Sequence, residues 1–341
     1  MLLVYMNIMN LVLFIIFLAV LIILYEKYRI TNVDNIAMVH SSTPQSAPQS
    51  IVTKDPRKAM IIEKYIFNKN KEFDDKPFIW IHIDYDINSR EWLDFGSRNS
   101  RNLNRPYIKI CLQQMIKMNG GDFNIVIIDD TSFKDLIPRW EMDLVNTPEP
   151  LRTHIRILSL MKLIYHYGGI LCPASFFSTK KLISIFNAND AFIFESLQNY
   201  RDNINFHPNI NFLGGKKMNS TIKNIMVYLE GLHRADYYSI FGFDKLVSEY
   251  IKTLSDKKEI NVINGSKIGI KTSDNKGIHV NHLVEDSDIQ LAPNALGLYI
   301  PQEELEERTR YNWITYVSID ELLESKTFMG RLFKKHFTKT L

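Results

Sequence analysis

The chain has 341 residues, of which 45% are hydrophobic and 23% charged, and its formal net charge is +3. A chain of this length and composition can bury a full α/β core, which excludes wholesale disorder. The small charge gives no argument for nucleic acid as a partner, and no zinc-finger spacing is present. Cys111 and Cys172 are the only cysteines, so a disulfide framework and a four-cysteine metal site are also excluded.

The chain begins with a segment that predicts a membrane anchor. Residues 1–24 contain no charged side chain, and residues 11–25 are apolar apart from a final tyrosine. About 20 apolar residues suffice to cross the hydrocarbon core of a bilayer. Neither the basic start nor the small-residue cleavage site of a signal peptide is visible. We therefore predict that residues 1–25 form an uncleaved, single-pass anchor in the lipid bilayer.

The flanking charges bear on the orientation of this anchor. Lys27 and Arg29 follow it and are partly offset by Glu26, so the positive-inside rule favours a large domain on the cytoplasmic side. The sequons at Asn219 and Asn264 would be usable only in the opposite topology.

Residues 26–55 are polar and include a stretch rich in serine, proline and glutamine. Such a segment cannot bury enough apolar surface to offset its ordering entropy, so we predict a flexible linker. The folded domain is then expected to cover residues 56–341, beginning with a helix over residues 58–68.

Residues 77–84 are almost continuously apolar, which is typical of a central parallel strand covered on both faces. Ligands of open α/β sheets lie at the carboxyl ends of the strands. Trp80, His82 and Asp84 are therefore candidates for the wall of a ligand site, and ordinary strand packing is the other interpretation.

Asp84 and Asp86 form an Asp-x-Asp pair just after this strand. Carboxylate oxygens, together with substrate phosphates, are the ligands that Mg²⁺ or Mn²⁺ prefers. The pair predicts either a divalent metal site or two aspartates that cap a turn. The four arginines between residues 89 and 105 could bind a pyrophosphate, or they could belong to a solvated loop.

A helix over residues 106–118, a glycine turn and a strand over residues 123–130 come next. Parallel strands joined by helices predict a Rossmann-like sheet. Asp129 and Asp130 end the second strand. They would either contact a ribose or cap the helix expected around residues 133–137.

The most informative stretch begins with a helix over residues 148–167. Asn146 or Thr147 could cap it, and Pro148 suits its first position because the missing N–H would have no partner there. Apolar residues at helical spacing indicate that most of this helix is buried. Arg152 and Arg156 fall on its narrow polar side.

Two glycines end this helix. Gly168 can adopt the left-handed backbone of a helix stop, and Gly169 permits a close approach to a neighbouring segment. Residues 170–172 are then expected to form a short buried strand up to Pro173, which cannot donate to a ladder.

The apolar helix, the sequence Tyr-x-Tyr-Gly-Gly-Ile and the short strand resemble the core of the sugar-nucleotide-dependent transferases of the capsular polysaccharide synthesis and mannosyltransferase type. The resemblance spans roughly residues 77–195. It implies a GT-A-like fold, that is, a Rossmann-like, mostly parallel sheet flanked by helices. In this alignment the family's helical Asp and Arg fall on Ile157 and Leu160, and its acidic strand end falls on Pro173.

The resemblance implies a membrane-anchored glycosyltransferase that transfers a sugar from a nucleotide-sugar donor to a glycan or other hydroxyl acceptor. Because the metal-binding Asp-x-Asp is missing at Pro173, the enzyme would use Arg152 or Arg156 as its catalytic cations, or hold Mn²⁺ or Mg²⁺ at Asp84 and Asp86. The expected donor site comprises Trp80, His82, Asp84, Asp129, Asp130, Gly168 and Gly169. The alternative is a catalytically inactive GT-A-fold membrane protein with a structural or binding role.

The remainder of the chain predicts a strand over residues 190–195 and helices over residues 220–233 and 244–254, and residues 209–217 resemble the segment that follows this strand in the family. A late polar cluster would either supply a metal-binding histidine or form a surface turn; its members are His279, His282, Asp286 and Asp288.

Overall fold

The computed structural model divides the chain between Thr53 and Lys54 into two units. All residues that it describes belong to the second unit: 76–83, 105–200, 203–234, 240–307, 310–315 and 317–337. Among these residues, no helix is both long and apolar enough to cross a bilayer. Several predicted features lie outside the described residues, namely the anchor at 1–25, the linker at 26–55, the helix at 58–68, and Asp84 with Asp86.

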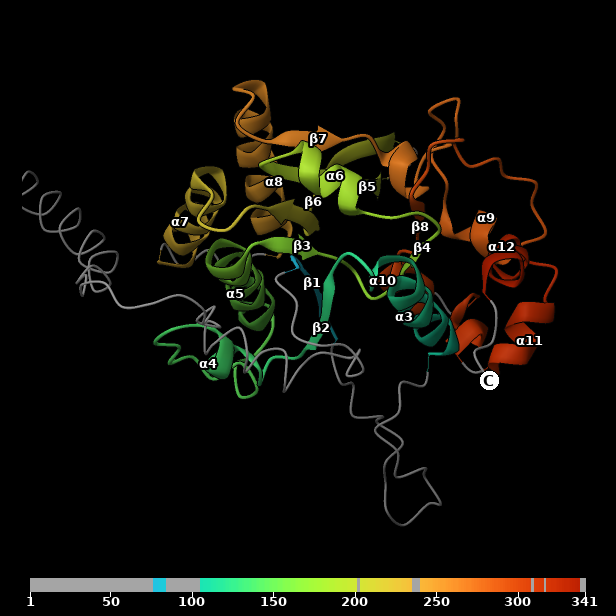
Figure 1. Cartoon of the computed structure of the whole chain (residues 1–341), viewed down its shortest axis with the longest axis horizontal. Helices are drawn as coiled ribbons and strands as arrows, with labels where there is room; N and C mark the ends of the chain where they lie inside the picture. Colours follow the sequence, from blue (N-terminus) through green and yellow to red (C-terminus); the bar gives the residue numbers. More distant parts are fainter. Residues whose placement is uncertain are drawn as a thin grey trace, which may run out of the picture. The chain divides into compact units, whose positions relative to one another are not determined.

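The described residues form an α/β fold around a mixed, largely parallel sheet of six strands (Figure 1). Its order is β2 (Asn124–Ile128), β1 (Phe78–His82), β3 (Gly169–Leu171), β6 (Asn203–Gly215), β5 (Ala191–Tyr200) and β7 (Asn261–Ile263). β1 is parallel to β2 and β3, and β5 is parallel to β7, whereas β6 runs antiparallel to both of its neighbours. The predicted central strand at residues 77–84 and the predicted helix-linked parallel sheet are confirmed.

The two faces of the sheet carry separate hydrophobic cores. Phe78 and Trp80 of β1 point into one core, and Ile79 and Ile81 point into the other. The first core is covered by α4 (Phe133–Leu136), α5 (Leu151–Tyr167), α7 (Ser220–Arg234) and α8 (Ile240–Asp256). The second core is covered by α3 (Pro106–Asn119), α6 (Ile183–Ala188), α9 (Val280–Val284), α10 (Gln302–Glu307), α11 (Ile319–Glu324) and α12 (Phe328–His336).

A small antiparallel sheet of β4 (Phe176–Ser178) and β8 (Gly297–Tyr299) belongs to the second core. Short 3₁₀ helices, η1 (Gly265–Ile268) and η2 (Asn312–Thr315), complete the described elements. Cys111 and Cys172 are both free and buried. Burial raises the pKa of both thiols, as expected for small hydrophobic residues.

The predicted start of the central helix at Pro148 is wrong, because α5 begins at Leu151 with Pro150 as its N-cap. Glu149 precedes a proline, and the proline ring disfavours the helical conformation of the residue before it. Glu149 instead lies one residue before the N-cap, and its side chain caps the first turn of α5. Its carboxylate accepts hydrogen bonds from the Thr153 backbone N–H at 3.2 Å and from the Thr153 hydroxyl at 2.7 Å.

The two glycines after α5 end the helix and allow a close approach as predicted, but Gly168, with a ψ of −176°, does not adopt the predicted left-handed helical conformation. Gly168 has a φ of 71° and its N–H donates to Ile164 O at 2.8 Å, which ends the helix. Gly169 has a φ of 113°, and a Cβ atom there would lie 2.3 Å from Phe78 O. Only glycine therefore allows β3 to pack this closely against β1.

The Trp80 side chain, from the middle of β1, lies in the first core. It is completely buried, and its indole Nε1–H donates to Gly168 O at 2.9 Å. This hydrogen bond joins β1 to the end of α5.

Replacing Trp80 by phenylalanine should lower the free energy of unfolding by about 2 kcal/mol. The substitution keeps an aromatic ring in the core, but it leaves the buried Gly168 carbonyl without its donor and opens a small void. Urea denaturation of the full chain in detergent measures the change. Trp313→Phe is the matched control, because Trp313 is 37% exposed and should shift stability by less than about 0.5 kcal/mol. Equal stability of Trp80→Phe and the wild type would contradict the prediction.

Candidate functional site

The carboxyl ends of the parallel strands form one edge of the sheet. Four residues are aligned across it: Trp80 in β1, Leu171 in β3, Leu213 in β6 and Ile193 in β5. His82, Pro173 and Glu195 each come two residues after a member of this row. His82 and Pro173 therefore lie at the edge at which open α/β sheets bind ligands, whereas Glu195 lies within β5, which continues to Tyr200.

A partly buried polar cluster lies at the β1 and β2 end of this edge. The Arg156 guanidinium donates to both carboxylate oxygens of Asp130, from Nε to Oδ1 at 2.8 Å and from Nη2 to Oδ2 at 2.6 Å. His82 Nε2 lies 2.9 Å from Asp130 Oδ1. The side chains of His82, Asp130 and Arg156 are only 11%, 14% and 14% exposed. The sequence named all three as candidates, and the structure brings them together.

The electrostatics of the cluster keep Asp130 ionised. Burial disfavours the charged carboxylate and by itself raises its pKa, but the hydrogen bonds from Arg156 and His82 outweigh burial and hold the pKa of Asp130 well below its usual range. An ionised carboxylate can only accept hydrogen bonds, so His82 donates through Nε2–H. The His82 ring also stacks on Phe133, with ring centroids 5.9 Å apart.

Asp129 has a different role from its neighbour. Its Oδ1 accepts hydrogen bonds from the Thr131 hydroxyl at 2.7 Å, the Ser132 hydroxyl at 2.7 Å and the Ser132 N–H at 2.9 Å. Of the two predicted alternatives, Asp129 thus makes the capping contacts of the turn that leads into α4. Asp130 makes the ion pair instead.

The other named residues lie around the cluster or below it. Arg152 Nε donates to Thr147 O at 2.8 Å, so this arginine binds the loop before α5 rather than Asp130. Trp80, Gly168 and Gly169 are buried and join β1, α5 and β3.

The segment after β3 offers no carboxylate to the sheet edge. Pro173 is half-buried, and the buried Ser175 hydroxyl donates to Ile300 O at 2.7 Å. Ile157 and Leu160 of α5 are packed in the first core.

The described strand ends do not fit a divalent cation. Mg²⁺ and Mn²⁺ need several hard oxygen ligands around one point. The Asp129 carboxylate is bound by its own turn, and that of Asp130 by a guanidinium and an imidazole. Within the described part of the chain, no group of three or more His, Cys, Asp or Glu residues could hold a metal.

The sequence reasoning did not single out a second ion pair, at the β5 end of the edge. Lys271 Nζ lies 2.5 Å from Glu195 Oε2, and the Gly265 N–H donates to the same oxygen at 2.7 Å. Lys271 Nζ also lies 3.8 Å from the centroid of the Phe206 ring. An acidic residue that ends an apolar strand was a signal for Glu195, but nothing marked Lys271, which is 76 positions away.

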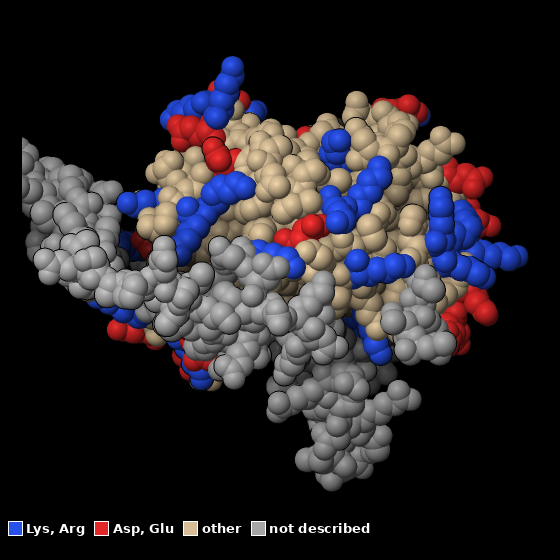
Figure 2. Space-filling view, viewed as in Figure 1, with Lys and Arg blue, Asp and Glu red and all other residues tan. Residues whose placement is uncertain are grey.

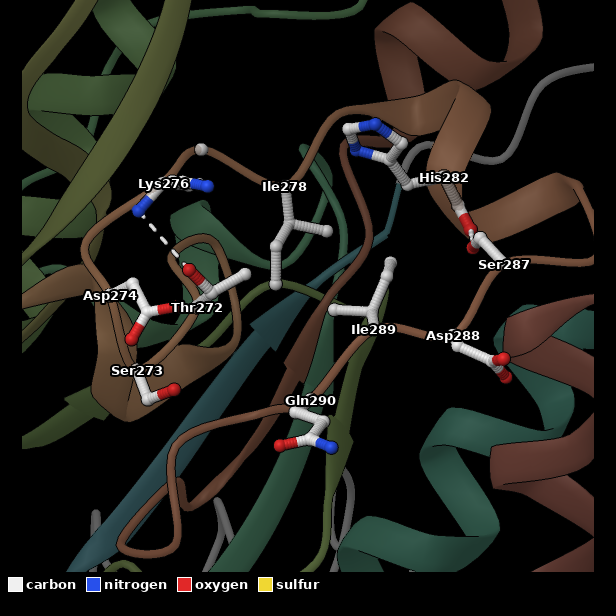
Figure 3. A pocket seen from close by; sticks show the side chains of 11 residues that line it. Thr272, Ser273, Asp274, Lys276, Ile278, His282, Ser287, Asp288, Ile289 and Gln290 are labelled. Atoms are coloured by element: carbon white, nitrogen blue, oxygen red, sulfur yellow. Dashed lines mark hydrogen bonds between the residues drawn. The ribbon is translucent and has the colours of Figure 1, made fainter.

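The late polar cluster borders a separate cavity of about 470 Å³. Figure 3 shows Thr272, Asp274 and Lys276 on one side of it and His282 and Asp288 on the other. None of the predicted donor-site residues lines this cavity. His282 Nδ1 accepts the backbone N–H of His279 at 3.1 Å, which fixes the start of α9. The two histidines thus form the N-terminal cap of α9.

Charges on the visible face are mixed. Figure 2 shows Lys and Arg side chains in several separate groups, with acidic side chains between them. This distribution agrees with the small net charge of the chain.

Comparison of the chain with protein-family models, with curated proteins and with solved structures found no match.

Proposed function

We propose that this chain is a membrane-anchored, glycosyltransferase-like protein of the GT-A type. It would transfer a sugar from a nucleotide-sugar donor to a glycan or other hydroxyl acceptor, with the large domain on the cytoplasmic side. The observation that carries the proposal is the cluster of Arg156, Asp130 and His82 at the carboxyl ends of β1 and β2. It lies where a doubly wound sheet binds nucleotides.

The chemistry of the cluster suits such a donor. Sugar transfer requires a positioned donor and compensation of the negative charge that develops on the leaving diphosphate. Arg156 supplies a guanidinium whose planar donors match phosphate oxygens. Asp130 supplies a carboxylate that can accept a ribose hydroxyl, and His82 supplies a flat ring beside it. The proposed reaction is written with the side chains of this cluster alone, and Asp84 and Asp86, the predicted ligands of Mn²⁺ or Mg²⁺, lie outside the described residues.

A second candidate is a catalytically inactive GT-A-fold protein that only binds a glycan or nucleotide. The observation that favours it is the bidentate contact of Arg156 with Asp130, which already compensates the charge of the arginine. The absence of a carboxylate at Pro173 points in the same direction.

Titration of the full chain in detergent with UDP-glucose, UDP-galactose, UDP-N-acetylglucosamine and GDP-mannose tests the proposal. Each donor is added with and without Mn²⁺, and the melting temperature is followed. A donor that binds the folded state raises the melting temperature. Release of UDP or GDP during incubation identifies a transferase, whereas binding without release identifies the inactive protein. No shift with any donor, in either metal condition, would reject both nucleotide-binding proposals.

Arg156→Ala should abolish the donor-induced rise in melting temperature, because it removes the guanidinium that would face the phosphates. Arg152→Ala is the matched control, since it removes an arginine one turn earlier that binds the loop carbonyl of Thr147. The control should keep the rise in melting temperature. An unchanged rise in Arg156→Ala would reject the assignment of this arginine to the donor site.

A further inference from the structure

The cluster of Arg156, Asp130 and His82 holds a fixed negative charge as well as a positive one. Asp130 Oδ1 lies 2.8 Å from Arg156 Nε and 2.9 Å from His82 Nε2, and Asp130 Oδ2 lies 2.6 Å from Arg156 Nη2. These contacts hold the pKa of Asp130 well below its usual range, so the carboxylate stays ionised at neutral pH. The charge of the guanidinium is therefore compensated before any ligand arrives.

This compensation affects the binding of a bare phosphate or pyrophosphate ion. A phosphate oxygen that binds the same guanidinium at an ordinary hydrogen-bond distance comes within roughly 5 Å of the Asp130 carboxylate. The side chains of Asp130 and Arg156 are each 14% exposed, so water screens two negative charges poorly here. At the effective dielectric constant of a partly buried site, repulsion between unit charges at this distance lowers affinity by more than about tenfold. Asp130 therefore disfavours ligands that bring only negative charge.

A nucleotide differs from these ions because it also carries hydrogen-bond donors. Its ribose hydroxyls and base N–H groups can donate to an ionised carboxylate, and such charge-assisted bonds are stronger than neutral ones. The carboxylate that repels the phosphates thus attracts the nucleoside of the same ligand. An arginine without this neighbour would bind phosphate, pyrophosphate and nucleotides through the same planar donors.

We infer that Asp130 makes the donor site select nucleotides against free phosphate and pyrophosphate. The inference rests on the proposed function and adds a specificity-determining residue to it. Selectivity is a difference between two affinities, so a carboxylate that weakens the binding of the wrong ligand raises selectivity as a new contact with the right one does. Asp130 is suited to this role because Arg156 and His82 fix its carboxylate beside the guanidinium that would bind the phosphates.

Calorimetric titration of Asp130→Asn and of the wild type, as full chains in detergent without divalent metal, tests the inference. The probes are UDP, GDP and sodium pyrophosphate at one ionic strength. The variant should bind pyrophosphate at least about tenfold more tightly than the wild type, because the repelling charge is gone. The preference for UDP or GDP over pyrophosphate should fall by at least the same factor. An unchanged or weaker affinity of the variant for pyrophosphate would overturn the inference and leave Asp130 as a residue that only holds Arg156.

Two further measurements complete the test. Glu230→Gln is the matched control, because it removes a carboxylate from another partly buried pair on α5, with Lys162 at 3.0 Å, and should leave every affinity unchanged. If Asp130→Asn does not fold, the wild type alone decides, since a wild type that binds pyrophosphate as tightly as UDP and GDP would contradict the selection. A wild type that binds neither the nucleotide sugars nor UDP or GDP would instead reject the proposed function, and this inference with it.

Discussion

Gly169→Ala is expected to lower the free energy of unfolding by about 3 kcal/mol or more. A Cβ atom at this position would lie 2.3 Å from Phe78 O and 3.1 Å from Phe78 Cβ, and the backbone φ of 113° is one that L residues rarely adopt. Relief of either conflict would move β3 away from β1 in the middle of the sheet. The cost therefore combines backbone strain with overpacking and loss of strand pairing.

Urea denaturation followed by circular dichroism measures this change. Gly231→Ala in α7 is the control, because a Cβ atom there meets nothing within 4 Å and alanine is the better helix former. The control should be neutral or raise stability by up to about 1 kcal/mol. If Gly169→Ala were as stable as the wild type, the close contact between β1 and β3 would be wrong.

Asp130→Asn is the second substitution with a large expected effect, a loss of about 3 kcal/mol in the free energy of unfolding at neutral pH. The substitution keeps the shape of the side chain but removes the negative charge that Asp130 places against the mostly buried guanidinium of Arg156. Glu285→Gln is the control, since it removes a carboxylate from an exposed pair with Arg310 and should cost less than about 1 kcal/mol.

The pH dependence of stability gives an independent test of this ion pair. The pKa of Asp130 is lower in the folded protein than the usual value of about 3.9 in an unfolded chain. Its contribution to stability is therefore fully present above the unfolded value and is lost as the pH falls from there through the lower, folded value. The wild type should lose more stability than Asp130→Asn over this acid range, as measured by urea denaturation at each pH. Parallel pH profiles of the two proteins would contradict the ion pair.

The elements that could be predicted from the sequence are those with strong local signals. The apolar run of β1 and the glycine pair after α5 each specify their structure through neighbouring residues. The position of the site at the strand ends also followed from topology alone. Asp130 at the end of β2 and Arg156 on the polar side of α5 were separate candidates whose pairing required the fold.

The features that escaped prediction depend on contacts between distant residues. β4 and β8 are three residues each and pair across more than 100 positions, so neither has a periodic signal of its own. β5 extends well beyond its predicted end at residue 195 because it pairs with β6 in a long hairpin up to Tyr200. In the pair of Glu195 and Lys271, only Glu195 has a weak local signal in the sequence, and nothing in the sequence marks Lys271 as its partner. The helix start at Leu151 could have been predicted from the sequence, because the restriction that Pro150 places on the backbone of Glu149 is local.

The central place of β1 in the sheet has a consequence for biosynthesis. This strand emerges from the ribosome well before either neighbour, since it pairs with β2 at residues 124–128 and with β3 only at residues 169–171. At roughly 5 to 20 residues per second, the apolar segment Phe78–His82 waits several seconds with both hydrogen-bonding edges unsatisfied. Exposed strands of this kind associate readily with other chains. Safe production of the domain therefore depends on shielding of β1, by the nascent chain itself or by a chaperone, until Gly169 arrives.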